Sequence, residues 1–141
     1  MKTRSYSTVV EGEKMEKIKR LPDAELEIMK IIWEAKEEVT SAYIMSQLKG
    51  VKTWGNTTVL NFLARLVERG FIQSERVGKS NVYTAIIEEK SYLQNESKSF
   101  LERLHGNSVK SLIAALYNGN TITDQDLREL KDFIDENTRE D

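Results

Sequence analysis

One segment limits the fold more than any other feature of this sequence, because its apolar residues follow a helical period without a gap. Between residues 56 and 69 they recur at the i, i+3, i+4, i+7 and i+8 positions of one helical face. The residues of this face are Val59, Phe62, Leu63, Leu66 and Val67. Asn56 or Thr57 is the expected N-cap, and Gly70 stands where a glycine commonly ends a helix. We therefore predict a helix with a single buried face.

Two shorter helical patterns precede this segment. The first covers about residues 22–35 and places Pro22 in its first turn, where the fixed φ of proline is tolerated. Its apolar face is formed by Ile28, Met29, Ile32 and Trp33. The second is expected to begin at a cap on Thr40 or Ser41 and to end near Gly50. Its buried residues are expected to be Ile44, Met45 and Leu48.

The residues that follow Gly70 predict a two-stranded hairpin over 72–87. The runs QSERV and NVYTAII have the composition of strands and flank the turn residues Gly78, Lys79 and Ser80. Three helices and then a hairpin with a basic tip is the order of a winged helix-turn-helix, in which the third helix enters a major groove. We therefore expect a mainly α-helical fold with a small β-hairpin, built as a DNA-binding domain.

The distribution of charge agrees with that expectation better than the net charge does. The whole chain carries a net charge of -2, but residues 49–87 hold 6 basic and 2 acidic side chains, while residues 88–141 hold 7 and 12. The middle is thus basic and the tail acidic. This division favours a module that faces a polyanion, joined to a module that meets something else.

The candidate DNA-contacting residues lie on the predicted third helix, in the turn before it and at the hairpin tip. Short hydroxyl and amide side chains can reach base edges or phosphates, a leucine can contact a thymine methyl group, and basic residues at the tip suit phosphates. The candidates are Lys52, Trp54, Thr57, Thr58, Leu60, Asn61, Arg65, Arg76, Lys79 and Ser80.

Each of these candidates also has a structural interpretation. Thr57, Thr58 and Asn61 fit the polar face of any surface helix, and Trp54 fits a core position under the turn. Basic residues at a hairpin tip are often only solvated. Leu60 either contacts a base methyl group, packs on the preceding turn, or is an incidental exposed leucine.

Beyond Glu88 the pattern predicts three more amphipathic helices. Ser108 is the expected cap of the second, and Thr123 to Asp126 form a capping-box variant before the third. A short acidic tail cannot readily bury so many apolar faces within itself, which argues for helix exchange between two copies of the chain. The alternative is that the tail folds back onto the predicted DNA-binding domain of the same chain. The candidate dimerisation residues are Leu101, Leu104, Leu112, Ile113, Leu116, Leu127, Leu130 and Ile134.

Several classes of protein are excluded by what the sequence lacks. Without cysteine there is no disulfide, thiolate metal site or cysteine nucleophile, and the lone His105 fits the end of a helix better than a metal site. No paired carboxylates or phosphate-binding glycine loop appear at working spacing. With no long apolar run and no signal peptide, we expect a soluble, cytoplasmic protein that inserts in no membrane, is no enzyme and needs no cofactor.

Four stretches of the sequence resemble the BlaI/MecI family of bacterial winged-helix regulators, to which the CopY repressors also belong. They are LPDAELEIMKIIWE (21–34), KTWGNTTVLNFLARLVERGFI (52–72), VYTAIIEE (82–89) and SFLERLHGNSVKSLIAAL (99–116). The resemblance covers about residues 18–135. It implies a homodimeric repressor whose two heads bind a palindromic operator in double-stranded DNA and whose C-terminal helices interlock.

The resemblance also assigns roles to particular residues. It implies DNA contacts for Thr58, Leu60 and Asn61, with Lys52 and Trp54 in the turn and Lys79 in the wing. Leu60 departs from the arginine of the relatives. Because an alkyl group replaces a bidentate donor there, base preference can change by about 1–3 kcal/mol.

Two modes of induction occur among the relatives. In the β-lactam branch a protease linked to a membrane sensor cuts before a phenylalanine, which corresponds here to Ser99-Phe100, although the relatives carry asparagine before the cut. Such a cut would separate the heads from the dimerisation unit. In the copper branch the tail carries Cys-x-Cys pairs, so a chain without cysteine cannot sense copper in that way.

The sequence thus predicts three parts. Residues 1–14 are a disordered N-terminal extension, residues 15–88 a winged helix-turn-helix domain, and residues 89–141 a helical dimerisation domain. The leading hypothesis is a dimeric transcriptional repressor that reads its operator with the helix at about 56–69 and the basic wing. The alternative is a winged-helix module that binds proteins and has no specific DNA target.

Overall fold

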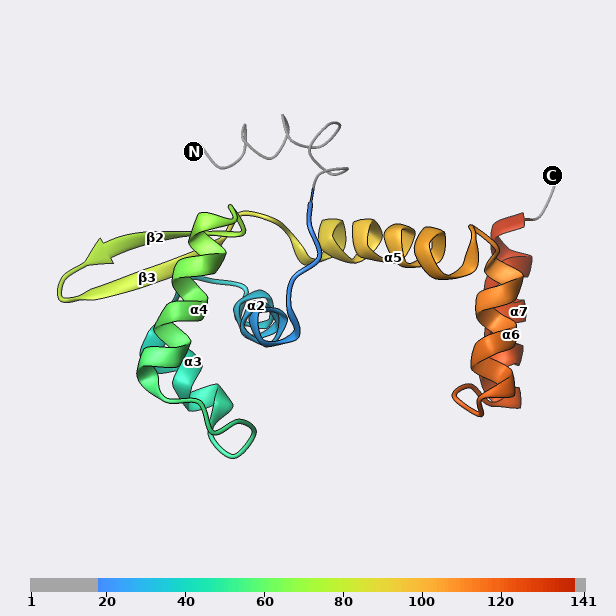
Figure 1. Cartoon of the computed structure of the whole chain (residues 1–141), viewed down its shortest axis with the longest axis horizontal. Helices are drawn as coiled ribbons and strands as arrows, with labels where there is room; N and C mark the ends of the chain where they lie inside the picture. The colour runs from blue at the N-terminus through green and yellow to red at the C-terminus, as the bar shows by residue number, and fades with distance from the viewer. Residues whose placement is uncertain (1–17, 139–141) are drawn as a thin grey trace. The chain divides into compact units, whose positions relative to one another are not determined.

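The computed structural model describes residues 18–138, which fall into two compact units that meet between Glu96 and Ser97 in the sequence. The predicted extension at residues 1–14 lies outside the described residues. The first unit holds α2 (Asp23–Ala35), β1 (Val39–Thr40), α3 (Ser41–Leu48), α4 (Asn56–Glu68), β2 (Ile72–Val77) and β3 (Ser80–Ala85) (Figure 1). The helix α5 (Glu89–His105) begins in this unit and ends in the second, which also holds α6 (Val109–Asn118) and α7 (Asp124–Thr138). None of the helices described is long and apolar enough to cross a membrane.

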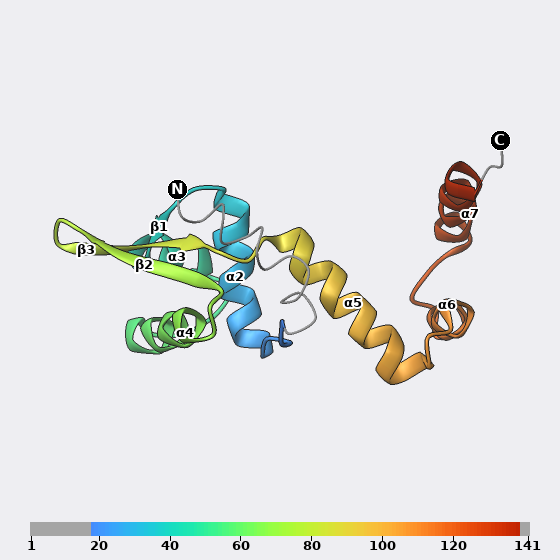
Figure 2. The ribbon, with the colours of Figure 1, turned by 90° about the horizontal axis from the view of Figure 1, so that it is seen from above.

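The predicted hairpin belongs to a three-stranded antiparallel sheet in which β3 lies between β1 and β2. The prediction of only two strands was therefore incomplete, because Val39 and Thr40 pair with Tyr83 and Val82. A strand of two residues has no alternation that a sequence pattern could reveal. Figure 2 shows β2 and β3 running together to a shared tip.

The hairpin turn contains two residues rather than the predicted three. Val77 pairs with Ser80, so Ser80 is the first residue of β3, and only Gly78 and Lys79 lie in the turn. Gly78 has a φ of 66°, a value that glycine adopts without steric cost and that two-residue hairpin turns require.

The core of the first unit forms where α2, α3 and α4 pack together and against the base of the sheet. Val59, Leu63 and Leu66 of α4 are fully buried, as predicted. Two other residues of the predicted buried face are not fully buried, since Phe62 is half-buried and Val67 is 38% exposed. The packed face of α4 is narrow, and these two positions lie at its margins.

The ends of α3 and α4 test the predicted caps. Thr40 caps α3, because its side-chain oxygen accepts a hydrogen bond from the Tyr43 N–H at 3.1 Å. The prediction that Asn56 or Thr57 caps α4 was wrong: the N-cap is Gly55, which has no side chain for this purpose, and Asn56 is already helical.

Gly70 ends α4 as predicted. Its φ is 82°, its N–H donates to the carbonyl of Val67 at 3.0 Å, and the N–H of Phe71 donates to the carbonyl of Leu66 at 3.0 Å. These two bonds form a Schellman motif, which satisfies carbonyl groups that the end of a helix leaves free.

The first turns of α5 pack on the winged helix. The Tyr92 hydroxyl accepts a hydrogen bond from the Leu21 N–H at 2.8 Å, and the Asn95 amide donates to the Ile18 carbonyl at 2.8 Å. The Tyr92 ring lies 5.8 Å from Trp33 and 5.7 Å from Phe71, between ring centroids. The sequence places the domain boundary after residue 88, whereas the structure groups residues up to Glu96 with the first unit.

In the second unit, the helix starts are fixed by side chains and the apolar faces remain open. The Ser108 hydroxyl accepts from the Ser111 N–H at 3.0 Å, which confirms the predicted cap of α6. Thr123 and Asp126 bond reciprocally, each side chain accepting from the other's backbone N–H, at 3.0 and 2.8 Å. This is the predicted capping box of α7. Neither α6 nor α7 has a buried residue.

Tyr92→Phe should lower the free energy of unfolding by about 1–3 kcal/mol, because the Leu21 N–H would stay buried without a partner. Urea unfolding monitored by circular dichroism checks this value. Tyr43→Phe is the matched control, because Tyr43 is 39% exposed. Removing its hydroxyl should change the free energy of unfolding by less than about 0.5 kcal/mol. Equal effects of the two substitutions would contradict the prediction.

The same hydroxyl predicts a pH dependence of stability. Burial raises the pKa of Tyr92 above its ordinary value of 10.0 and outweighs the opposite effect of the Leu21 N–H. A raised pKa means that the folded state favours the neutral hydroxyl, so the stabilisation is complete below pH 10.0 and declines above it. The difference in unfolding free energy between wild type and Tyr92→Phe should therefore shrink as the pH rises past 10.0.

Candidate nucleic-acid interface

The outward face of α4 is a polar surface fixed by the buried face of the same helix. With Val59, Leu63 and Leu66 in the core, the opposite side of α4 must point away from α2 and α3. Thr57, Asn61 and Arg65 are exposed on this helix, and Thr58 is half-buried. The structure thus brings these four predicted contact residues together on the accessible side of α4.

Leu60 shares the accessible part of α4 with these polar residues. Its side chain is 39% exposed, although its neighbour Val59 is fully buried. Val67 follows Leu60 by seven residues and is similarly exposed, so the two form an apolar margin beside the polar face. Leu60 is therefore not a core residue, and its side chain is open to a ligand.

The turn before α4 holds an ordered group of side chains. Trp54 meets Phe62 edge to face, with ring centroids 5.0 Å apart and planes at 68°. The Lys52 ammonium lies 5.4 Å from the centroid of the Trp54 ring, within the range of a cation–π contact. Trp54 is half-buried, so it packs against α4 and also reaches the surface, and it restrains the lysine beside it.

The hairpin presents its basic and polar side chains to solvent. Arg76, Lys79, Ser80 and Asn81 are all exposed. The Arg76 Nε donates to the Gly78 carbonyl at 3.3 Å, a weak contact that leaves the rest of the guanidinium group free. The acidic Glu75 precedes Arg76 on β2, but adjacent residues of a strand point to opposite faces of the sheet.

A buried carboxylate beneath α4 was missed by the sequence analysis. Glu25 of α2 is 2% exposed and is the one buried charged residue among residues 18–138. Its Oε1 lies 2.8 Å from the Arg69 Nε, and its Oε2 lies 4.0 Å from an Arg65 Nη. The signal was present in the sequence, because Glu25 precedes Ile28, Met29 and Ile32 by three, four and seven residues and so shares their face.

The candidate dimerisation residues line the open faces of the second unit. Leu104 and Ile134 are 60% and 46% exposed. The remaining ones are half-buried, namely Leu101, Leu112, Ile113, Leu116, Leu127 and Leu130. In the candidate cleavage segment Ser99 is half-buried and Phe100 is 37% exposed, and both lie within the helix α5.

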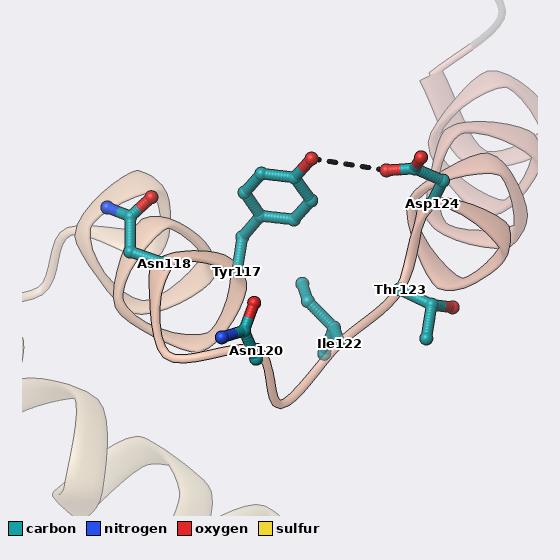
Figure 3. Close-up of a pocket in the computed structure, with 6 residues that line it drawn as sticks. All are labelled: Tyr117, Asn118, Asn120, Ile122, Thr123 and Asp124. Carbon is teal, nitrogen blue, oxygen red and sulfur yellow. Dashed lines mark hydrogen bonds between the residues drawn. The ribbon is translucent and has the colours of Figure 1, made fainter.

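A surface hollow near the end of α6 is open, and its lining is more polar than apolar (Figure 3). The Tyr117 hydroxyl there donates to the Asp124 carboxylate at 3.2 Å, and this bond raises the pKa of Tyr117. The other lining residues are Asn118, Asn120, Ile122 and Thr123.

His105, at the end of α5, forms a hydrogen bond with the Ser111 hydroxyl at 2.8 Å. Within residues 18–138 no cluster of histidine, aspartate or glutamate is arranged to hold a metal ion.

Comparison with known proteins gives consistent matches. The sequence model of the family described as penicillinase repressor matches residues 21–136. The penicillinase repressor of Bacillus licheniformis is 30% identical over 122 residues, which cover 86% of this chain and 94% of that protein. The methicillin resistance regulatory protein MecI of Staphylococcus aureus (strain N315) is 25% identical over 114 residues, covering 81% of this chain and 92% of that protein.

Among solved structures, the DNA-binding domain of the repressor BlaI matches 53% of this chain and 90% of its own, with 34% identity and a TM-score of 0.47. The family match extends from the start of the winged helix almost to the end of α7, so it includes both compact units. This chain therefore belongs to the penicillinase repressor family.

Proposed function

We propose that this protein is a transcriptional repressor that binds a palindromic operator as a homodimer. The observation that carries the proposal is the polar outward face of α4, which the buried stripe of that helix fixes in place, in a chain of the penicillinase repressor family. In a winged helix this face enters the major groove, and the wing contacts phosphates beside it. Family membership and the names of the relatives support DNA binding and repression.

Each part of the surface has its own task in this proposal. Thr57, Thr58, Leu60 and Asn61 lie in the first half of α4, where side chains of a recognition helix meet base edges. Arg65, one helical turn beyond Asn61, contacts a phosphate. Lys52 with Trp54, and Arg76, Lys79 and Ser80 of the wing, hold the backbone and set the register of the helix on the duplex.

The occupant of the open apolar faces of α5, α6 and α7 is a second copy of the chain. Half-buried and exposed apolar residues at helical spacing, with no buried residue in α6 or α7, are typical of an interface seen without its partner. Two identical units can bury these faces reciprocally around a twofold axis. The second head then binds as an intramolecular event, so the affinity for a palindrome exceeds that of one head by about 10²–10⁴.

Proteolysis between Ser99 and Phe100 would end repression, because it would remove the gain in operator affinity that two joined DNA-binding units provide. The first unit extends to Glu96, so a cut at this bond leaves its packing whole and separates it from α6 and α7. Both residues lie within α5, and a protease binds its substrate in an extended form, so this part of the helix must open before cleavage. A protease linked to a sensor is the partner that this step requires.

Arg76→Ala and Lys79→Ala should each weaken operator binding and reduce the slope of log affinity against log salt by about one, because each removes one phosphate contact. Fluorescence anisotropy of a labelled duplex, selected from random sequences by the wild type, measures both quantities across a KCl series. Lys110→Ala removes an exposed lysine of the second unit and should leave both unchanged. If the wing variants bind like the wild type, the module that binds proteins becomes the better hypothesis.

Leu116→Asp should convert the dimer into a monomer, because it places a charge in the apolar face of α6. Sedimentation equilibrium gives the mass, and binding to the full palindrome should fall about 100-fold, towards that of a half-site. Lys110→Asp adds a carboxylate to the same helix away from that face and should remain dimeric. A wild-type protein that sediments as one copy would refute this part of the proposal.

A recognition sequence for a specific protease, introduced at residues 97–100, tests the cleavage step. After digestion, affinity for the full palindrome should fall to that of the half-site, while the circular dichroism of the head is retained because Tyr92 and Asn95 remain attached to it. The same recognition sequence placed after Asp141 is the control, and its digestion should change nothing. Unchanged affinity after a cut at 97–100 would exclude induction by this mechanism.

A further inference from the structure

We propose that Glu25 is a positioning residue that sets how selectively α4 reads its operator. The inference rests on the proposed function and deepens it. Glu25 lies on α2, which contacts no DNA in the proposal, yet its carboxylate faces Arg65 of α4 and Arg69, the C-cap residue of that helix. Burying a carboxylate to this degree costs free energy, and an ion pair that compensates this cost adds little net stability. Stability alone therefore does not explain why a charged residue occupies this position.

The two arginines engage Glu25 unequally. Arg69 donates from Nε to the carboxylate at 2.8 Å, and its side chain is 37% exposed. Arg65 stands at 4.0 Å, beyond hydrogen-bond distance, and its side chain is 56% exposed. Arg69 is therefore the fixed link between α2 and α4, whereas the guanidinium of Arg65 is attracted to the same carboxylate and remains open to a ligand.

This geometry has two effects on DNA recognition. The link through Arg69 holds the C-terminal half of α4 against α2, which fixes the angle at which the helix enters a groove. The attraction on Arg65 limits its rotamers before DNA arrives, so less freedom is lost when it meets a phosphate. Glu25 also places a negative charge near the duplex, which weakens binding to any sequence that does not gain from the fixed geometry.

Glu25→Gln tests the proposal because it keeps the shape of the side chain and an acceptor for Arg69 but removes the charge. We expect affinity for the selected operator to fall about tenfold, while affinity for a shuffled duplex stays the same or rises, so the ratio of the two falls. A purely structural role would lower the folded fraction without changing this ratio among folded molecules. Urea unfolding of the full-length protein gives the folded fraction.

Two further variants make the test specific. Arg69→Lys keeps the charge of both partners but loses the planar fork of the guanidinium. It leaves Glu25 and Arg65 unchanged and should also lower the ratio of operator affinity to shuffled-duplex affinity. It decides the question if Glu25→Gln does not fold. Glu27→Gln removes one negative charge from the same helix without touching either arginine ion pair, and it should leave the ratio at the wild-type value.

The decisive comparison is a double-mutant cycle with Arg65→Gln. If Glu25 acts by positioning Arg65, the double variant should bind the operator about as weakly as Arg65→Gln alone. Additive losses would refute the positioning of Arg65 and leave only the link through Arg69, and a Glu25→Gln variant that discriminates as well as the wild type would overturn the inference as a whole; both results would leave the proposed function intact. A wild type that shows no preference for the operator over the shuffled duplex would instead refute the proposed function, and the inference with it.

Discussion

The surface that this protein offers to a partner depends on the packing of one narrow helical face. Val59, Leu63 and Leu66 of α4 are completely buried, and a helix held along one line has only one orientation about its own axis. The residues on the opposite side of α4 are polar, and Leu60 and Val67 lie at one margin of that side. Deleting a buried leucine from such a core costs about 2–5 kcal/mol. The orientation of the outward side of α4 is therefore a consequence of hydrophobic burial.

Two buried polar contacts complete what the apolar core begins. The carboxylate of Glu25 joins α2 to α4, and the hydroxyl of Tyr92 joins the first turns of α5 to Leu21. Each contact links segments far apart in the sequence and has its partner in a place where an unsatisfied group would be expensive. A hydrogen bond of 2.8 Å depends on direction as well as distance, so these contacts add directional restraints to those of the core.

The order of helices and the hairpin could be predicted because each has a local signal: the stripe of α4, the glycines at 70 and 78, and the caps at Thr40, Ser108 and Thr123. Features that depend on distant partners could not. β1 is a strand only because β3 lies beside it, and Tyr92 belongs to the first unit through its hydrogen bond with the Leu21 N–H. The placement of Leu60 on an accessible margin of α4 agrees with its separation from the buried stripe.

Under the dimerisation proposed above, the caps of α6 and α7 have a consequence for the speed of assembly. Ser108 fixes the first residue of one helix and Thr123 with Asp126 fixes the first residue of the other, each within a single copy. Ordering the backbone of one residue costs about 1–2 kcal/mol of conformational entropy. A helix whose first turn is already capped has met part of this cost before it contacts another subunit. In the dimer that we propose, subunits whose helix starts are already fixed would associate without first ordering these turns, at rates limited mainly by diffusion and orientation.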